Sequence, residues 1–103
     1  MHVAPSGPPQ DMNITVLNTT SMKVTWTPPS RDHQNGNVQY YILRIVEAES
    51  GREEVLNIFS TLHFIAGYLH PHYTYRVSVA AVTIAAGPTT EPQEVKMPQD
   101  GKF

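Results

Sequence analysis

The sequence predicts an all-β protein, a seven-stranded antiparallel sandwich of two sheets. Residues 72–83 alternate in hydrophobicity, with one face formed by Tyr75, Val77, Val79 and Ala81, which is the pattern of a half-buried strand. Shorter segments of this kind recur between turn signals, and none has apolar residues at helical spacing. A chain of 103 residues without cysteine is therefore expected to form one domain held by the packing of its sheets.

The expected strands follow one another between prolines, glycines and short polar segments. Pro28-Pro29 ends the second strand because proline donates no hydrogen bond to a ladder. Asn35-Gly36 marks a loop over residues 30–37, and Ser50-Gly51 marks another turn. The predicted strands are residues 12–17, 22–27, 38–46, 55–59, 62–66, 72–83 and 94–97. The register of the fourth and fifth stays open, because both carry apolar residues on both faces.

The structural core is predicted at Trp26, Tyr41, Leu69 and Tyr75. The first two lie on the inward face of their strands, and Tyr75 follows a corner made by Leu69-His70-Pro71. A tyrosine placed in this way buries its ring and bonds its hydroxyl back to corner backbone. These aromatic residues are therefore interpreted as core and not as a ligand cage.

The order and spacing of these residues resemble the fibronectin type III family. The residues that carry the resemblance are Pro9, Trp26, Pro28-Pro29, Gly36-Asn37-Val38, Tyr41, Leu69-His70-Pro71, Tyr75, Val77, Val79, Ala81 and Gly87. The modules most similar in appearance are those of receptor-type tyrosine phosphatase and neural cell-adhesion receptor ectodomains. The resemblance implies a domain over residues 9–98, with residues 1–8 a linker or the start of an excised fragment, and 99–103 a linker. Ala66 is smaller than the usual inward aliphatic at its position, and the Arg-Gly-Asp tripeptide is absent.

Composition excludes several classes of function. The net charge is −2 and the seven basic residues are scattered, so no nucleic-acid surface is expected. No apolar run approaches the roughly 18 residues of a spanning helix, and the start of the chain does not read as a signal peptide. The isolated domain is expected to be monomeric.

Neither a metal site nor a catalytic site is predicted. His70 and His72, with His63 upstream, form the nearest approach to a zinc ligand set. Pro71 and the corner are expected to splay the two rings, and no cysteine is available to complete the set. No nucleophile elbow or phosphate-binding loop is present, so no cofactor and no enzymatic activity are expected of this chain. An enzymatic domain elsewhere in the parent protein is compatible with this prediction.

Two acceptor triplets for N-glycosylation begin at Asn13 and Asn18. Asn13 has the outward parity of its strand and Asn18 lies in a turn, so both positions accommodate a sugar. The alternative is that the triplets are fortuitous in an intracellular module.

A possible protein contact is the outward face of the third and sixth strands, at Tyr40, Ile42, Val46 and Val82, together with Ala80. These residues form a contiguous apolar face if the two strands pair, as they do in the family. The alternative is that the stems of Arg44 and Arg76 cover this face. The loops at residues 28–37 and 83–91 form a second candidate surface, by analogy with antibody loops.

The function that follows is a non-catalytic module of a larger cell-surface receptor or adhesion protein, acting as spacer and protein-interaction unit. It would lie in the extracellular part of a single-pass membrane protein, with the neighbouring domains of the parent chain and an unidentified protein as partners. The alternative is an intracellular structural module of a muscle or cytoskeletal scaffold.

Overall fold

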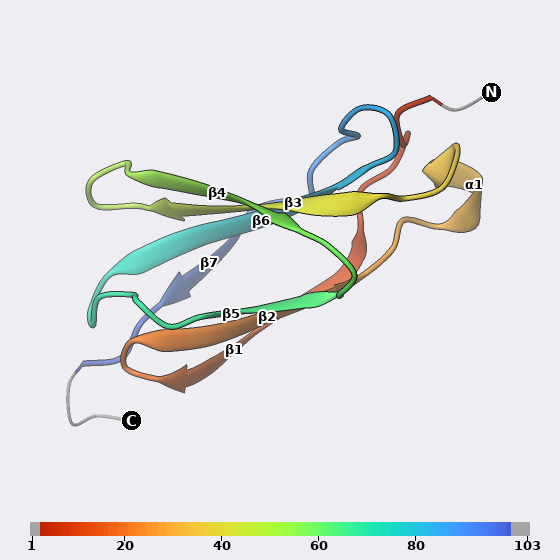
Figure 1. Ribbon diagram of the computed structural model, residues 1–103. Coiled ribbons are helices and arrows are strands. Elements are labelled where there is room, and N and C mark those ends of the chain that lie inside the picture. Colours follow the sequence, from red (N-terminus) through yellow and green to blue (C-terminus); the bar gives the residue numbers. More distant parts are fainter. Residues whose placement is uncertain (1–2, 100–103) are drawn as a thin grey trace.

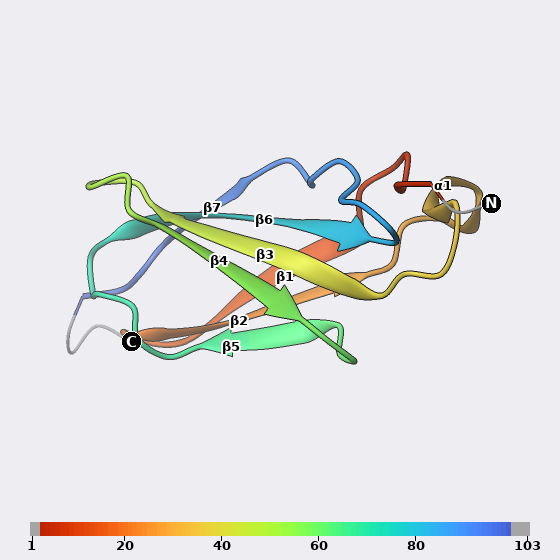
Figure 2. The same ribbon diagram turned by 45° about the horizontal axis from the view of Figure 1, so that its top comes forward.

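The computed structural model describes residues 3–99 and shows two antiparallel sheets stacked face to face (Figure 1). One sheet has three strands in the order β1-β2-β5, and the other has four in the order β4-β3-β6-β7, with β3 and β6 in the middle (Figure 2). The elements are β1 (Gln10–Asn18), β2 (Ser21–Thr27), α1 (Arg31–Gln34), β3 (Tyr40–Glu47), β4 (Glu53–Ile58), β5 (His63–Ala66), β6 (Thr74–Val82) and β7 (Gln93–Lys96). The predicted all-β sandwich of seven strands is confirmed.

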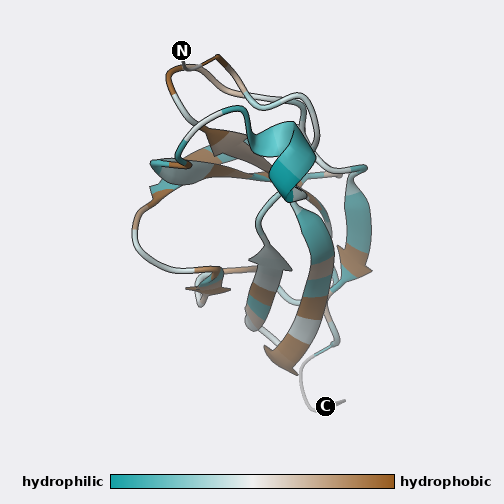
Figure 3. Ribbon diagram, turned by 90° about the vertical axis from the view of Figure 1, so that its right-hand side faces the viewer, coloured by the Kyte–Doolittle hydropathy of each residue, from teal (hydrophilic) through white to brown (hydrophobic). Residues whose placement is uncertain are grey.

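The core lies between the sheets and is formed by alternate residues of the central strands. Met22 and Val24 of β2 face Leu43 of β3 and Val77 of β6, and all four side chains are fully buried. Because successive side chains of a strand point to opposite faces, these alternate apolar residues turn one face of each strand toward the other sheet. Brown and teal bands alternate along the strands in Figure 3 for the same reason.

The structure buries the four residues predicted as core. Trp26 is 2% exposed and Tyr41 6%, and their rings meet edge to face with centroids 5.6 Å apart. This geometry is the preferred one for aromatic pairs. The indole Nε1 of Trp26 is buried without a hydrogen-bond partner among residues 3–99, so the indole stabilises the core through its apolar area.

Tyr75 closes the turn that leads into β6. Its hydroxyl accepts a hydrogen bond of 2.8 Å from the backbone N–H of His70. The backbone N–H of Leu69, in the same corner, donates to the carbonyl of Thr20 in the other sheet's hairpin, at 2.9 Å. The corner is therefore fixed to both sheets, and burial raises the pKa of Tyr75 although the bond from His70 acts to lower it.

The strand register left open by the sequence is set by long-range pairing. Ala66 pairs with Met22 and is fully buried, while Ile65 pairs with Lys23 and faces outward. In β4, Leu56 pairs with the core residue Leu43. A small residue at position 66 therefore fits because the larger Met22 fills the space beside it.

One turn of helix is a correction to the sequence prediction, which expected no helix. The loop over residues 30–37 contains α1, which ends at Asn35 in the left-handed conformation with φ of 57°. Asparagine tolerates this conformation better than most residues. Four residues are too few to show helical periodicity, which is why the pattern indicated only a loop.

Candidate protein-contact surface

The outward face of the four-stranded sheet is more apolar than a typical solvent-facing sheet surface. Tyr40, Ile42 and Val46 of β3 point away from the core and are half-buried. Their parity is opposite to that of the buried residues Tyr41 and Leu43. The structure thus brings these three predicted contact residues together on one strand of one face.

Val82 and Ala80 do not contribute to this face, which corrects the sequence expectation. Val82 pairs with Tyr40 and Ala80 pairs with Ile42, as the family resemblance implied. Val82 is nevertheless 5% exposed, and Ala80 is also buried. The reason is that β6 is an inner strand, with larger side chains beside it on β3 and a bridge from Val82 to Ala86 on its other side.

Two residues of the neighbouring strand segment enlarge the face. Phe59 is 60% exposed and stacks on Tyr40, with ring centroids 4.9 Å apart. Val55, on the outward side of β4, is 50% exposed and pairs with Arg44. We call Tyr40, Ile42, Val46, Val55 and Phe59 the outer patch. The sequence alone did not reveal the last two, because the faces of Val55 in β4 and of Phe59 directly after β4 depend on the register of β4 with β3.

Ion pairs are present on the same sheet. Arg44 contacts Glu53 at 2.9 Å, and Arg76 contacts Glu94 at 3.2 Å, and all four side chains are substantially exposed. Exposed pairs of this kind contribute about 0–1 kcal/mol to stability. Each guanidinium is engaged with an acidic residue of the adjacent strand, and Val55 and Phe59 remain at least half exposed. Arginine stems therefore leave much of the outer patch accessible to a partner.

A groove of about 530 Å³ borders the outer patch at Tyr40. It runs between the loop after β2 and residues 60–62, and its walls include Val38 and the exposed Leu62. Contact surfaces between proteins typically combine aromatic anchors with a recess that receives partner side chains. The stacked pair Tyr40–Phe59 beside this groove has that arrangement.

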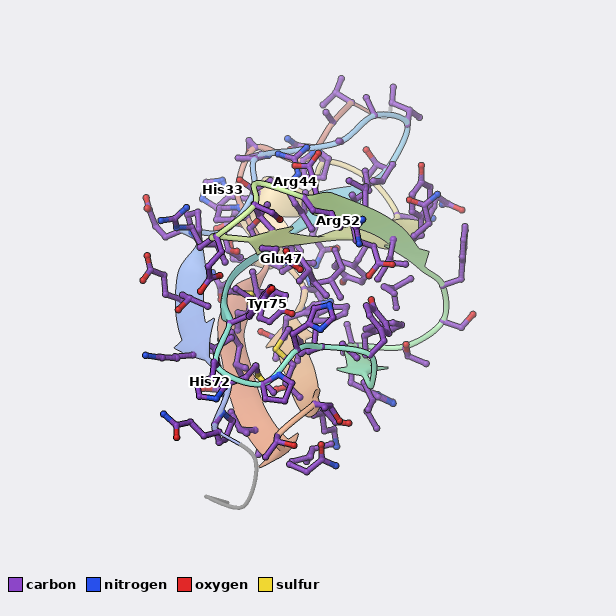
Figure 4. The ribbon with its side chains drawn as sticks, turned by 90° about the vertical axis from the view of Figure 1, so that its left-hand side faces the viewer. His33, Arg44, Glu47, Arg52, His72 and Tyr75 are labelled. Atoms are coloured by element: carbon purple, nitrogen blue, oxygen red, sulfur yellow. The ribbon has the colours of Figure 1, made fainter. Side chains whose placement is uncertain are left out.

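A second depression, of about 310 Å³, lies between the β3–β4 hairpin and the tyrosine corner. Glu47 and Arg52 line it on the hairpin, and Tyr75 reaches it from between the sheets (Figure 4). The carboxylate of Glu47 accepts a hydrogen bond of 2.5 Å from Ser50, and that of Glu54 accepts one from the Tyr68 hydroxyl. These carboxylates thus make structural contacts within the hairpin and across to the other sheet.

His63, His70 and His72 do not form a ligand cluster. Within residues 3–99, no group of three or more histidine, cysteine or acidic side chains is placed to hold a metal ion. His63 lies on β5, whereas His70 and His72 belong to the corner. There the ring of His70 packs on the ring of Tyr73, with centroids 4.9 Å apart. His72 has a positive φ of 73°, so the backbone turns sharply at this position.

The two glycosylation candidates lie on the three-stranded sheet. Asn13 is exposed on β1 and pairs with Thr25 of β2. Asn18 ends β1, and its side-chain oxygen accepts hydrogen bonds from the backbone N–H and the hydroxyl of Thr20, at 2.9 and 3.2 Å. This turn leaves the Asn18 side chain exposed in the β1–β2 hairpin. Glycosylation of either residue stays a prediction.

Comparison with known proteins identifies the family. A sequence profile described as fibronectin type III domain matches residues 7–96. The chain belongs to the fibronectin type III family. This result confirms the family predicted from the order of Trp26, Tyr41 and Tyr75.

The similar proteins are much longer than this chain. Human Roundabout homolog 2 is 40% identical over 101 residues, which cover 89% of this chain and 7% of that protein. Receptor-type tyrosine-protein phosphatase F of Rattus norvegicus is 32% identical over 102 residues, covering 97% of this chain and 5% of that protein. The crystal structure of the FN5 domain of Drosophila Lar has 30% identity and a TM-score of 0.76, and the match covers 92% of this chain and 98% of that one. This fibronectin type III domain therefore spans a small fraction of the curated relatives it matches.

Proposed function

We propose that this fibronectin type III domain is a non-catalytic module of a larger cell-surface receptor or adhesion protein, where it serves as spacer and protein-interaction unit. One relative is receptor-type tyrosine-protein phosphatase F, and the match covers 5% of that protein. Any enzymatic activity of the parent would then belong to another domain. Within residues 3–99, no helix has the length and hydropathy needed to cross a membrane.

The shape of the domain supports the spacer role. The body measures 52 × 23 × 19 Å. The described chain begins at the end that carries α1 and finishes at the opposite end, beyond β7 (Figure 1). A module with this geometry in a tandem array adds its length to the array and holds its neighbours apart.

The observation that carries the interaction role is the outer patch. It combines the stacked aromatic pair Tyr40–Phe59, three β-branched residues and an adjoining groove. Aromatic residues at the centre of a contact supply much of the binding energy in protein interfaces. The partner proposed here is a protein surface with an apolar centre that covers Phe59 and Tyr40.

The extracellular location is proposed from the two acceptor triplets. Asn13 and Asn18 belong to the three-stranded sheet, whereas the outer patch lies on the outward face of the other sheet. The outward faces of two stacked sheets point in opposite directions. Sugars at these positions would therefore leave the outer patch uncovered, so the two proposals are compatible.

Two experiments test the proposal. The domain is expressed through a glycosylating secretory host, and its mass is measured before and after enzymatic removal of N-glycans. A mass loss that disappears in the Asn13→Gln, Asn18→Gln double variant is expected, and an unchanged mass in the original sequence contradicts the extracellular assignment.

The contact is tested with the secreted extracellular region of the parent protein, whose binding to cell surfaces is titrated. Phe59→Ser is expected to weaken binding at least tenfold, which corresponds to about 1.4 kcal/mol. Ile65→Ser is the matched control, because Ile65 is also exposed but belongs to the other sheet. Equal binding by the two variants would argue against the outer patch as the contact.

A further inference from the structure

The segment before β1 has the composition of a linker, yet it is bonded to the loop that carries α1. The backbone N–H of Val3 donates to the carbonyl of Asn35 at 3.2 Å. The side-chain amide of Asn35 donates in return to the carbonyl of Ala4 at 3.1 Å. Asn35 therefore holds the beginning of the described chain through both its backbone and its side chain.

Ser6 and Gly7 continue this contact along α1. The backbone N–H of Ser6 donates to the carbonyl of His33 at 2.8 Å, and the Ser6 hydroxyl lies 3.0 Å from the His33 ring Nδ1. Gly7 is packed so closely that a Cβ atom there would lie 2.9 Å from the Cβ of His33. The absence of a side chain at position 7 thus permits the segment to lie against the helix.

The loop after β6 holds the segment from its other side. The hydroxyl of Thr83 donates to the carbonyl of Val3 at 2.5 Å. A Cβ atom at Gly87 would lie 2.7 Å from both the Cβ and the carbonyl oxygen of Pro5, which is itself buried. Residues 3–7 therefore run between two loops that are about 50 residues apart in sequence and lie at the same end of the sandwich (Figure 1).

Two exposed apolar residues belong to this end of the domain. Ile84, at 69%, is the most exposed large apolar residue of the described chain, and Val3 is 45% exposed. The bond from the Thr83 hydroxyl to the Val3 carbonyl holds residue 3 against the residue that precedes Ile84, so Val3 and Ile84 belong to the same end of the domain. Beside them α1 is hydrophilic (Figure 3), so the end face has an apolar part next to the entry point and a polar part around it. We call Val3, Ile84 and the helix α1 the end face.

We propose that residues 3–7 form a rigid lead, and that the module preceding this one in the parent chain docks on the end face. This inference rests on the proposed function, since it requires a parent with a module before residue 1. The occupant is argued from the path of the chain: a covalently attached module at this end is present at high effective concentration. A small apolar contact suffices under those conditions, and domain interfaces within a chain are usually modest in area.

The rigidity of the lead distinguishes it from an ordinary linker. A flexible linker of Gly/Ser composition would let the preceding module point in many directions. Here hydrogen bonds and close packing fix the path from Val3 to Gly7, and Pro5, Pro8 and Pro9 restrict the backbone torsions. The direction in which the preceding module projects is therefore set by this domain.

The first experiment measures backbone amide order parameters in the isolated domain. Values of about 0.85 are expected at Val3, Ala4 and Ser6, as in rigid backbone. Gly87→Ala is expected to lower them below about 0.6, because the new methyl group displaces Pro5. Gly67→Ala is the matched control, since a Cβ at Gly67 meets only the Ser21 hydroxyl at an ordinary 3.6 Å.

Two results would overturn the rigid lead. One is an order parameter below about 0.6 at these positions in the original sequence, and the other is equal values in Gly87→Ala and its control. Thr83→Val serves as a second variant if Gly87→Ala fails to fold, because it removes the hydroxyl donor to Val3 with little change of shape.

The second experiment uses a fragment of the parent that holds this domain and the module before it. Residual dipolar couplings are expected to give both modules one common alignment. Ile84→Ser is expected to abolish the common alignment. Leu17→Ser is the control and should preserve it, because Leu17 is an exposed residue of β1, away from the end face. Independent alignments in the original fragment would overturn the docking and leave the proposed function intact. A parent in which no module precedes this one would overturn the docking alone, whereas the order parameters test the lead by itself.

Discussion

The hydrogen bond from the His70 N–H to the Tyr75 hydroxyl is open to a one-atom test, the substitution Tyr75→Phe. The bond is 2.8 Å long and partly buried, and the Tyr75 ring is almost wholly enclosed. Phenylalanine preserves the ring packing but removes the acceptor, so the cost is that of leaving a backbone N–H without its partner. That cost is about 1–3 kcal/mol, a considerable part of the 5–15 kcal/mol that stabilises a typical domain.

Urea unfolding followed by fluorescence measures this loss directly. The chain has a single tryptophan, and Trp26 is buried, so its emission reports the opening of the core. In thermal unfolding, the same loss is expected to lower the melting temperature by about 4–8 °C for each kcal/mol. Tyr40→Phe is the control, because Tyr40 is a half-buried tyrosine of the outer patch. A loss below about 0.5 kcal/mol, or one equal to the control, would refute the role assigned to the corner bond.

Three further predictions concern the core, alkaline pH and one turn. Trp26→Ala is expected to cost about 3–5 kcal/mol in urea unfolding, because it removes the largest buried ring; a loss under about 1 kcal/mol would contradict its role as core anchor. Burial raises the pKa of Tyr41 and of Tyr75, so unfolding releases protons above pH 10 or so. The contribution of these two tyrosines to the free energy of unfolding should be fully present below that pH and should be lost as pH rises through their folded-state pKa values. Tyr41→Phe should reduce this loss. An unchanged urea midpoint between pH 8 and 11 would disprove the prediction. Gly51→Ala is expected to cost about 1–2 kcal/mol, measured by calorimetry, because Gly51 has a φ of +76°, which disfavours any residue with a Cβ. No atom lies near that position, so the cost comes from the backbone alone. An unaltered melting temperature would be the contrary result.

Much of the core was predictable from local pattern. Alternation along a strand depends only on neighbouring residues, so Trp26, Tyr41 and Tyr75 could be assigned to the inside before any pairing was known. The family also followed from the sequence, because it is defined by the order of such residues. The acceptor triplets at Asn13 and Asn18 are equally local, and the structure leaves both asparagines exposed.

The outer patch was predictable only in part. Tyr40, Ile42 and Val46 share one parity on one strand, so alternation sufficed to group them. Val82 shares the face by pairing but is covered, because β6 has a neighbour on each side. Phe59 was missed because its stacking on Tyr40 depends on the register between β4 and β3, and the apolar residues on both faces of β4 left that register open.

The amino-acid sequence by itself determined the sandwich, the aromatic residues buried inside it and the family, since all three depend on spacing along the chain. The tertiary structure alone decided which outward residues stay exposed and what becomes of residues 3–7. Their Pro/Gly/Ser composition indicates a linker, but the contacts that hold them come from Asn35, Thr83 and Gly87. Such contacts join segments far apart in the chain, and only the folded arrangement of both sheets brings them within reach.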